Sequence, residues 1–275
     1  MNVENMPPLR DSLEAHGLLA KKSFGQHFLL DLNITRKIAR LAGPLEGQTV
    51  IEVGPGPGGL TRALLAAGAR VIAVEMDPRF IPLLEELGDA AGPGALTLVQ
   101  GDALKVDEAS LAGGPAHLVS NLPYNVGTPL LVKWLKAGAW RGDMTLMFQK
   151  EVAQRIVAKP GSDAYGRLAV IAQARCDARL EFTVPARAFT PPPKIASAIV
   201  RLTNRADPYP HLDVLERVTA AAFGQRRKML RSALRALTPE AEPLLRAAGL
   251  DPTARAEDID QQGFRRLAEA WRATA

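Results

Sequence analysis

The sequence predicts an α/β fold with a doubly wound, mostly parallel sheet, followed by a smaller all-helical domain. Five short apolar stretches between residues 49 and 148 alternate with helix-length segments, a pattern typical of βαβ units. These stretches are almost continuously apolar, as expected of parallel strands that are buried on both faces. From about residue 205 the strand signals stop and only helical patterns follow. We therefore expect a sheet domain over residues 21–204 and a helical domain over 205–275.

The sheet domain is expected to contain seven strands. An appendage over residues 1–20, with a helix at 12–19, precedes it, and Asn33 is expected to cap a helix that runs to Leu41. The strands are predicted at 49–54, 70–75, 96–100, 117–121, 144–148, 179–184 and 197–202. The last two are joined by a short segment without a helical pattern, so they should pair as antiparallel neighbours at the sheet edge. The helices are predicted at 60–67, 78–87, 128–138 and 165–174, and then at 212–223, 226–236, 239–248 and 261–273.

The composition limits the classes of protein to which the chain can belong. With 47% hydrophobic and 23% charged residues it is globular, and no apolar run approaches the ~18 residues that span a bilayer. The first residues lack the basic-then-apolar pattern of a secretion signal, so a cytoplasmic location is expected. Cys176 is the only cysteine, which excludes an internal disulfide and a zinc site with cysteine spacing. The net charge of +5 is compatible with a nucleic-acid partner but does not establish one.

A glycine-rich stretch, EVGPGPGGLTRALL, connects the first strand of the predicted sheet to a helix. Its glycines, Gly54, Gly56, Gly58 and Gly59, allow positive φ and let a ligand approach the backbone, while free N–H groups at the helix start favour an anionic group. Glu75 ends the next strand, where a carboxylate can accept hydrogen bonds from both hydroxyls of a ribose. These features predict a site for an adenosine-bearing cofactor. The glycines also fit the dinucleotide fingerprint G-x-G-x-x-G, so a nicotinamide-dependent oxidoreductase is an alternative.

Two features favour S-adenosylmethionine over a dinucleotide. Asp102 follows the third strand and is suited to accept a hydrogen bond from an adenine amino group. Ala103 and Leu104 would lie beside the ring, and Met76 could cover its other face. The chain also lacks a second nucleotide-binding half, because no second glycine loop follows and the C-terminal part is helical. Taken alone, Asp102 could equally be a turn residue after Gly101.

The segment SNLPYN, at 120–125, ends the fourth predicted strand, at the edge where ligands bind in open α/β sheets. An exocyclic amine of a base is a poor nucleophile because its lone pair is delocalised into the ring. The side-chain carbonyl of Asn121 and the backbone carbonyl of Leu122 can accept its N–H bonds and free that lone pair. Pro123 fixes the turn, and Tyr124 offers a face on which the base can stack. The alternative is an ordinary proline turn with a buried tyrosine.

These motifs together resemble those of the ribosomal RNA adenine dimethyltransferases. The matching stretches are GQHFLLD, VIEVGPGPGGLT, AVEMD, GDAL, NLPYN and FTPPPKIASAIVRL, and FGQRRKMLRSAL extends the match into the helical domain. The resemblance implies a class I, Rossmann-like methyltransferase domain over 21–204, with S-adenosylmethionine as cofactor, and an RNA-binding domain over 205–275. It also implies dimethylation of N6 on two adjacent adenosines in the 3′-terminal hairpin loop of 16S ribosomal RNA, within the small subunit or its precursor.

Residue by residue, the resemblance assigns cofactor contacts to His27, Leu29, Gly54, Glu75, Asp102 and Asn121. Gly56, Met76 and Ala103 join this set from the reading of the glycine loop and the adenine site. Position 27 departs from the family pattern, because many relatives carry asparagine there, and a histidine makes the contact depend on protonation. Phe189, in AFTPPPK, matches a family aromatic that could cover the target base opposite Tyr124. Alternatively, Phe189 packs beneath the turn at Pro191–Pro193.

A basic stretch in the helical domain predicts contact with a polyanion. FGQRRKMLRSALRAL contains no acid and five cations, Arg226, Arg227, Lys228, Arg231 and Arg235. On one helix, three of these arginines would line a single face, where like charges destabilise the helix unless RNA phosphate faces them. The alternative is a solvated, charged helix. A second group of cations is expected to extend the patch, and it consists of Lys21, Lys22, Arg36, Lys37 and Arg40.

Two other functions stay open. The first is methylation of large-subunit RNA, although enzymes of that kind typically carry isoleucine at the position of Leu122. The second is a non-catalytic RNA-binding or assembly factor that checks the small subunit, which is compatible with catalysis by the same protein. His16, His117 and His211 fit no triad or metal spacing, so we expect them to be structural or surface residues and expect no metal. Nothing in the sequence requires more than a monomer.

Overall fold

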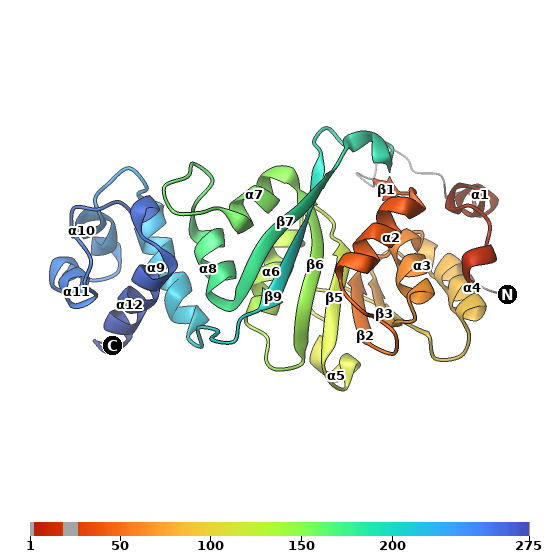
Figure 1. The fold of residues 1–275 in the computed structure, drawn as a ribbon, viewed down its shortest axis with the longest axis horizontal. Helices are drawn as coiled ribbons and strands as arrows, with labels where there is room; N and C mark the ends of the chain where they lie inside the picture. Colours follow the sequence, from red (N-terminus) through yellow and green to blue (C-terminus); the bar gives the residue numbers. More distant parts are fainter. Residues whose placement is uncertain (1–2, 19–26, 275) are drawn as a thin grey trace. The chain divides into compact units, whose positions relative to one another are not determined.

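The computed structural model describes residues 3–18 and 27–274 of the chain (Figure 1). The chain divides into two compact units, Met1–Ala153 with Arg179–Thr203, and Gln154–Ala178 with Asn204–Ala275. The predicted boundary near residue 204 therefore needs a correction, because a segment from the middle of the chain belongs with the C-terminal helices. This segment contains α8 (Arg167–Arg175), whose residues are buried nearly all around and which packs against α9 (Leu212–Gly224) and α12 (Gln261–Arg272).

The first unit is built on a seven-stranded sheet, as the sequence predicts (Figure 1). Its strands, in spatial order, are β4 (Leu96–Gln100), β3 (Arg70–Glu75), β2 (Thr49–Val53), β5 (Ala116–Asn121), β6 (Arg141–Gln149), β9 (Ser197–Asn204) and β7 (Cys176–Val184). The pairs from β4 through β6 are parallel, and β9 is antiparallel to β6. The two late strands, β9 and β7, are neighbours at one edge.

The order of the strands defines where a ligand can bind. The chain builds β3 and β4 outward on one side of β2, and then crosses back to add β5 and β6 on the other side. The direction of construction thus reverses between β2 and β5. In open α/β sheets, ligands bind outside the carboxyl ends of the strands at this kind of switch point. The glycine loop and the SNLPYN segment follow these two strands.

Helices connect the parallel strands, and they are α3 (Gly59–Ala66), η3 (Pro78–Phe80) with α4 (Ile81–Ala91), α5 (Glu108–Ala112) and α6 (Gly127–Leu135). Two further helices lie at the ends of this run, α2 (Leu32–Leu41) before β2 and α7 (Lys150–Val157) after β6. The N-cap of α2 is Asp31, whose carboxylate accepts a hydrogen bond of 2.8 Å from the backbone N–H of Asn33. The expected cap at Asn33 was therefore two residues late. Asp31 is the better cap because its ionised carboxylate also interacts favourably with the helix dipole.

The N-terminal residues are part of the first unit, which corrects the expectation of an appendage. They form η1 (Val3–Asn5) and α1 (Leu9–Ala15), a helix that begins three residues earlier than predicted. The guanidinium of Arg62, on α3, donates hydrogen bonds to the backbone carbonyls of Glu4, Met6 and Pro7 at 2.8–3.0 Å. Leu13 is buried in a cluster that includes aromatic side chains of the sheet unit. The segment is therefore anchored by both polar and apolar contacts.

A second, two-stranded sheet was not expected from the sequence. In it, β1 (Phe28–Leu29) pairs antiparallel with β8 (Phe189–Thr190), and Leu29 lies opposite Phe189. Pairs this short carry no periodic signal, so the sequence alone could not reveal them. The pairing matters because it joins the motif that contains His27 to the motif that contains Phe189.

The second unit is helical, but one predicted helix is wrong. Besides α8, α9 and α12, its helices are α10 (Leu230–Ala233), η5 (Leu234–Ala236), α11 (Ala241–Ala247) and η6 (Ala256–Asp258). Residues 225–227 form a turn and Lys228 a bend, so the expected helix over 226–236 begins only at Leu230. The break is stabilised by an isolated bridge between Met229 and Arg255 and by a 2.8 Å hydrogen bond from the N–H of Leu230 to the carbonyl of Ala254. Within the described residues, no helix is long and apolar enough to span a bilayer.

Candidate active site

A cavity of about 820 Å³ lies at the carboxyl ends of the central strands, where the strand order reverses. The residues that the sequence suggested for the cofactor or the target base line this cavity, except Gly58 of the glycine loop. The set comprises His27, Leu29, Gly54, Gly56, Glu75, Met76, Asp102, Ala103, Asn121, Leu122, Pro123, Tyr124 and Phe189. The structure thus brings together stretches that lie far apart in the sequence, and their roles can be examined one by one.

The glycine loop contacts the SNLPYN segment directly. Gly54 has φ = +67°, and a Cβ atom on it would lie 3.1 Å from Cγ of Pro123. Gly56 and Gly58 also have positive φ. Gly59 has ordinary backbone angles, but a Cβ there would lie 2.7 Å from the carbonyl oxygen of Leu29. The glycines are therefore needed both for conformation and for close approach, and a larger residue at these positions would narrow the cavity or separate its walls.

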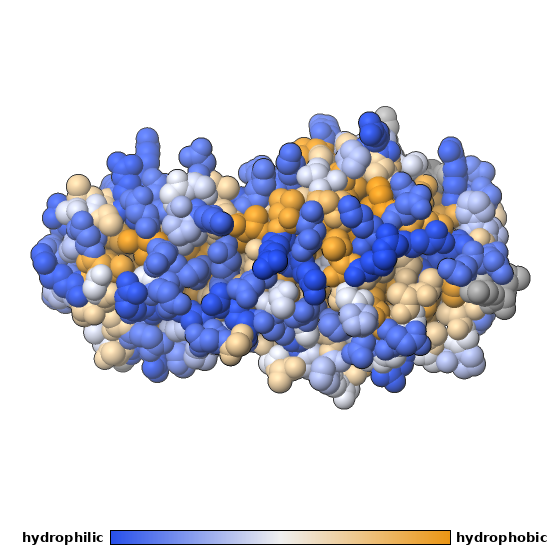
Figure 2. All heavy atoms as spheres, in the orientation of Figure 1, coloured by the Kyte–Doolittle hydropathy of each residue, from blue (hydrophilic) through white to orange (hydrophobic). Residues whose placement is uncertain are grey.

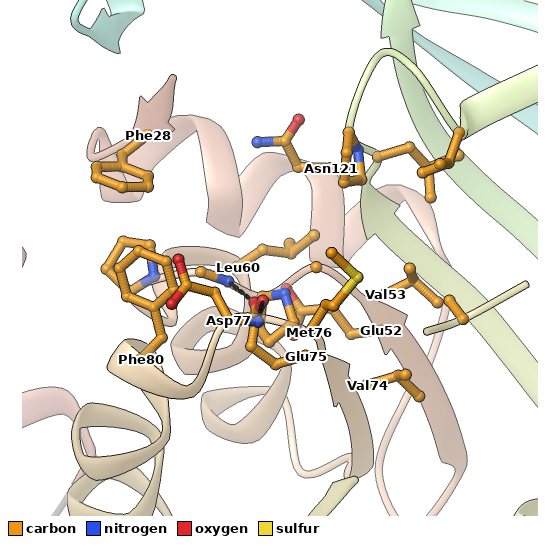
Figure 3. A pocket seen from close by; sticks show the side chains of 18 of the residues that line it. Phe28, Glu52, Val53, Leu60, Val74, Glu75, Met76, Asp77, Phe80 and Asn121 are labelled. Atoms are coloured by element: carbon orange, nitrogen blue, oxygen red, sulfur yellow. Dashed lines mark hydrogen bonds between the residues drawn. The ribbon is translucent and has the colours of Figure 1, made fainter. Parts of the chain in front are cut away.

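Glu75 is held at the floor of the cavity, as Figure 3 shows. One carboxylate oxygen, Oε2, accepts a hydrogen bond of 2.9 Å from the N–H of Gly56, and Oε1 accepts one of 2.8 Å from the N–H of Asp77. Burial raises the pKa of Glu75, and these backbone hydrogen bonds oppose that rise. Each oxygen keeps a further lone pair. The carboxylate is thus fixed in place while it can still accept hydrogen bonds from a ligand such as a ribose.

The expected adenine site combines a fixed carboxylate with exposed apolar side chains. Oδ1 of Asp102 accepts a hydrogen bond of 3.0 Å from the N–H of Leu104, so Asp102 does organise a turn. Its Oδ2 lies 3.9 Å from Nζ of Lys105, at the outer limit of an ion pair. Met76 and Leu104 are 71% and 40% exposed, although both are large and apolar and both line the cavity. Uncovered apolar surface beside a polar acceptor fits a flat heteroaromatic ring.

The SNLPYN segment presents its polar groups to the same cavity. Asn121, the last residue of β5, lines the cavity, and Figure 3 shows it on the other side of the drawn residues from Glu75. The hydroxyl of Tyr124 is 2.7 Å from Oγ of Ser197, a buried residue of β9. Burial raises the pKa of Tyr124, and the hydrogen bond with Ser197 opposes that rise. Ser197 therefore restrains the ring of Tyr124, a role that the sequence analysis missed.

His27 and Phe189 lie together through the two-stranded sheet. The Nδ1–H of His27 donates a hydrogen bond of 2.7 Å to the carbonyl of Pro191, which leaves Nε2 as an acceptor in the neutral ring. Its ring centroid is 6.3 Å from that of Tyr124. Phe189 is only 3% exposed and packs in a core cluster with Leu29. Packing beneath the turn at Pro191–Pro193 and contact with a target base both stay predictions for this residue.

Glu52 is a notable cavity residue that the sequence analysis overlooked. It lies on β2, is 1% exposed, and lines the cavity. Its Oε2 atom has no hydrogen-bond partner among the described residues. Burial raises the pKa of Glu52 to about 8, and the nearby carboxylate of Glu75 contributes to that rise, whereas Thr61 opposes it. The available signal was an acid inside the otherwise apolar strand TVIEV.

The basic residues of the second unit do not act as one helical face. Arg226 is half-buried and pairs with Glu257 at 2.7 Å, with a further contact of its guanidinium to the carbonyl of Ser162. The remaining members, Arg227, Lys228, Arg231 and Arg235, are exposed, but they are distributed over a turn, α10 and η5. Figure 2 shows that hydrophilic residues cover much of the visible face of these C-terminal helices. Their exposure permits contact with RNA, which stays a prediction.

The second group of cations is only partly described. Lys21 and Lys22 lie outside the residues that the structure describes. Arg36, Lys37 and Arg40 are exposed on α2, and Nζ of Lys37 lies 3.9 Å from the ring centroid of Phe182. These three residues belong to the unit that contains the cavity.

The fold and the cavity define a class I methyltransferase, with a mostly parallel sheet in which β9 is antiparallel, a glycine loop after β2, an acid at the end of β3 and another after β4. Residues 17–272 match the family described as ribosomal RNA adenine dimethylase. The chain belongs to this family, whose members are S-adenosylmethionine-dependent methyltransferases. The cavity fits that cofactor, because it offers a glycine cradle, a fixed acid and exposed apolar side chains in one place.

Individual relatives agree with this assignment. The chain is 70% identical to the ribosomal RNA small subunit methyltransferase A of Phenylobacterium zucineum, over 98% of this chain and 95% of the relative. It is 66% identical to the protein of the same name from Caulobacter vibrioides, over 92% of this chain and 97% of the relative. Among solved structures, it is similar to a dimethyladenosine transferase from Plasmodium falciparum, with a TM-score of 0.75 and 25% identity, over 88% of this chain and 96% of that chain.

The chain is also similar to a solved structure with a different RNA in its name. This structure is the 23S rRNA methyltransferase ErmE, with a TM-score of 0.68 and 27% identity, over 89% of this chain and 99% of that chain. The two solved structures therefore share the fold of this chain, but of these two names only that of ErmE specifies an RNA. The choice of RNA must be argued from the relatives of higher identity and tested directly.

Proposed function

We propose that the protein transfers methyl groups from S-adenosylmethionine to N6 of two adjacent adenosines in the 3′-terminal hairpin loop of 16S ribosomal RNA, dimethylating both. One observation carries the chemical part of this proposal. The glycine loop and the SNLPYN segment meet at the contact between Gly54 and Pro123, so the expected donor site and the expected acceptor site share one cavity. The choice of RNA is supported by the names of the two most similar relatives described above.

The target amine needs acceptors rather than a strong base. Its lone pair is conjugated with the purine ring, and hydrogen bonds from the amine to two carbonyl oxygens favour the pyramidal nitrogen that can attack. In our proposal, these oxygens belong to the side chain of Asn121 and the backbone of Leu122. Tyr124, restrained by Ser197, supplies the face on which the base stacks. The fixed turn at Pro123 holds these groups in register.

When bound, S-adenosylmethionine supplies an electrophilic methyl group on a sulfonium. Glu75 would hold the ribose and Asp102 the adenine amino group, with Met76 and Leu104 against the ring. His27 would accept a hydrogen bond from the methionine end through Nε2. The methylated amine carries a positive charge and loses its proton readily to water, so no residue is assigned as a general base. Positioning and electrostatics then account for most of the rate acceleration.

RNA recognition is proposed to use exposed cations on both units. Arg227, Lys228, Arg231 and Arg235 would contact phosphates from the second unit, whereas Arg226 is engaged with Glu257 and has mainly a structural role. Arg36, Lys37 and Arg40 would contribute from α2. We propose that the protein acts as a monomer, in the cytoplasm, on the small subunit or its precursor, and that it contributes to small-subunit biogenesis.

The test supplies the purified protein with isotopically labelled S-adenosylmethionine and separate preparations of undermethylated small and large ribosomal subunits. We expect label on small-subunit RNA alone, and digestion to nucleosides followed by mass spectrometry should show N6,N6-dimethyladenosine. Label on large-subunit RNA would redirect the proposal to the substrate named for ErmE. Absence of label from every RNA, with cofactor binding intact, would leave only the non-catalytic assembly role.

A further inference from the structure

A partly buried lysine outside the motifs described above fastens the loop after β4. Lys133, on α6, points its ammonium at this loop and donates hydrogen bonds of 2.8 Å to the carbonyl of Ala103 and 2.6 Å to the carbonyl of Val106. Its third contact is the carboxylate of Glu108, at 2.8–2.9 Å. An ammonium has three donors, and all three are therefore used.

The partner of Lys133 is itself fixed. Glu108, the first residue of α5, is 3% exposed, and its Oε1 also accepts a hydrogen bond of 3.0 Å from Nε1 of Trp134. Trp134 is fully buried on the same helix as Lys133. The carboxylate of Glu108 therefore holds the ammonium of Lys133 on one side, and on the other side the ammonium donates its hydrogen bonds to the loop carbonyls. A largely buried ion pair with this geometry favours a single arrangement of its surroundings.

The loop that Lys133 holds contains the expected adenine site. One other hydrogen bond joins the first residue of the loop to β3, from the N–H of Gly101 to the carbonyl of Glu75 at 2.9 Å. The remaining bonds are local, from the N–H groups of Leu104, Lys105 and Val106 to Asp102, and they shape the turn without attaching residues 102–106 to the rest of the unit. The two bonds from Lys133 do attach it, because α6 follows β5 whereas the loop follows β4. The carbonyl of Ala103 belongs to a residue that lines the cavity.

We propose that Lys133 is a positioning residue for recognition of the cofactor's adenine. It fixes the place of Asp102, Ala103 and Leu104 through two backbone carbonyls, while Glu108 and Trp134 keep its ammonium in place. The inference rests on the proposed role of Asp102 toward the adenine amino group. It extends the site to α6, so that the helix that follows the catalytic segment also sets the donor side of the cavity.

The test measures binding rather than turnover. The variant Lys133→Met with Glu108→Gln removes the donors without leaving an unpaired buried carboxylate, and the amide oxygen of the introduced glutamine can still accept from Trp134. Isothermal titration calorimetry measures the affinity of the protein for S-adenosylhomocysteine and for S-inosylhomocysteine, in which a carbonyl replaces the 6-amino group. The wild type should prefer the adenosyl ligand. The double variant should lose about tenfold or more of its affinity for that ligand and most of its preference, because the acceptor is displaced.

Two controls make the outcome specific. Lys136→Met changes an exposed lysine at the end of the same helix and should leave affinity and preference unchanged. Lys133→Gln, which keeps one donor group and no charge, should fall between the wild type and the double variant, and it decides the matter if the double variant folds poorly. Hydrogen exchange should speed up at the backbone amides of residues 103–107 in the variants and remain unchanged elsewhere.

The outcomes separate this inference from the site on which it rests. If the wild type binds both ligands equally, the role of Asp102 toward the amino group is wrong, and the inference falls with it. If the wild type discriminates and the variants keep the same affinity and preference, the role of Lys133 is wrong although the site stands. A uniform loss for both ligands, with faster exchange throughout the unit, would reduce Lys133 to a stabilising residue and overturn the inference.

Discussion

Glu52 illustrates how one side chain links stability to the chemistry of the cavity. Its carboxyl group is buried without a hydrogen-bond partner for Oε2 among the described residues, and the pKa of about 8 follows mainly from that burial. Near neutral pH the group is therefore protonated in the folded chain and ionised in the unfolded chain. It lies in a cavity that is expected to receive a cationic cofactor, where a carboxyl group that can ionise is useful.

The stability of the protein should depend on pH through Glu52. A pKa raised by folding favours the folded state fully below about pH 4.5, and this contribution is lost as the pH rises toward 8. Glu52→Gln mimics the protonated acid, so it should match the wild type at pH 4.5 and exceed its unfolding free energy at pH 8. Each unit of pKa shift corresponds to about 1.4 kcal/mol. Urea unfolding at several pH values measures the difference in unfolding free energy between the wild type and Glu52→Gln.

A matched change at an exposed acid provides the control for this experiment. Glu85→Gln, on α4, should leave the pH dependence of the unfolding free energy as it is in the wild type. Parallel pH profiles for the wild type and Glu52→Gln would contradict the account, since they would mean that the carboxyl group of Glu52 titrates alike in both states.

At the scale of elements, the N-terminal segment supports the cavity from behind. Arg62 binds three backbone carbonyls of this segment, and Leu13 of α1 packs with Phe28 and Phe80, which line the cavity. Loss of the segment would therefore uncover the back of two cavity residues. The segment links the stability of the first unit to its affinity for ligands.

Arg62→Met should release this segment. The carbonyls of Glu4, Met6 and Pro7 would lose their donors, at a cost of about 1–3 kcal/mol for the set. We expect a lower urea midpoint, faster proteolysis within the N-terminal residues and weaker binding of S-adenosylhomocysteine. Arg10→Met, which removes only an exposed ion pair with Glu14, should change stability by less than about 1 kcal/mol. Equal effects of the two substitutions would refute the anchoring role of Arg62.

The elements differ in how well the sequence revealed them. The strand β3 appears where predicted, because a buried parallel strand carries an almost pure apolar signal. The edge strand β4 also appears where predicted, although its residues are half-buried or exposed. The helix over 226–236 failed because its interruption depends on Met229 and Leu230 pairing with a distant segment, which no local pattern records. The pairing of β1 with β8 was not predicted for the same reason, because it joins two segments that lie far apart in the sequence. Local signals predict elements well, whereas breaks and short pairings depend on tertiary contacts.

At the scale of the whole molecule, the cofactor site was more predictable than the RNA surface. Loops at the ends of adjacent parallel strands must converge, so the residues of the glycine loop and of SNLPYN could be placed together from their order alone. Ser197, Glu52 and Lys133 could not, because each acts through a contact that depends on packing. The arginines of the second unit were recognised from their charge, but their predicted arrangement on one face assumed a continuous helix over 226–236, which the structure does not have.

The exposed arginines of the second unit give a test of RNA binding by the whole protein. Replacing Arg227 and Arg231 by glutamine should weaken RNA binding and reduce the slope of log affinity against log salt, by roughly 0.7–0.9 for each phosphate that is no longer neutralised. Arg272→Gln, on α12, removes a cation paired with Glu269 in the same unit and should leave the slope unchanged. Filter binding over a range of salt concentrations measures this slope for the wild type and both variants. A slope that stays constant in the double variant would show that these arginines face solvent.

The central claim is that carbonyl oxygens at the end of β5 hold the target amine in the cavity where the cofactor binds. Asn121→Ala tests it most directly, with single-turnover methyl transfer to undermethylated small subunits measured beside the affinity for S-adenosylhomocysteine. We predict that affinity stays within about tenfold of the wild type while transfer is nearly abolished, because the acceptor acts on the amine in the transition state. Asn33→Ala, on α2, should change neither quantity. Equal losses in binding and transfer for Asn121→Ala would contradict the claim.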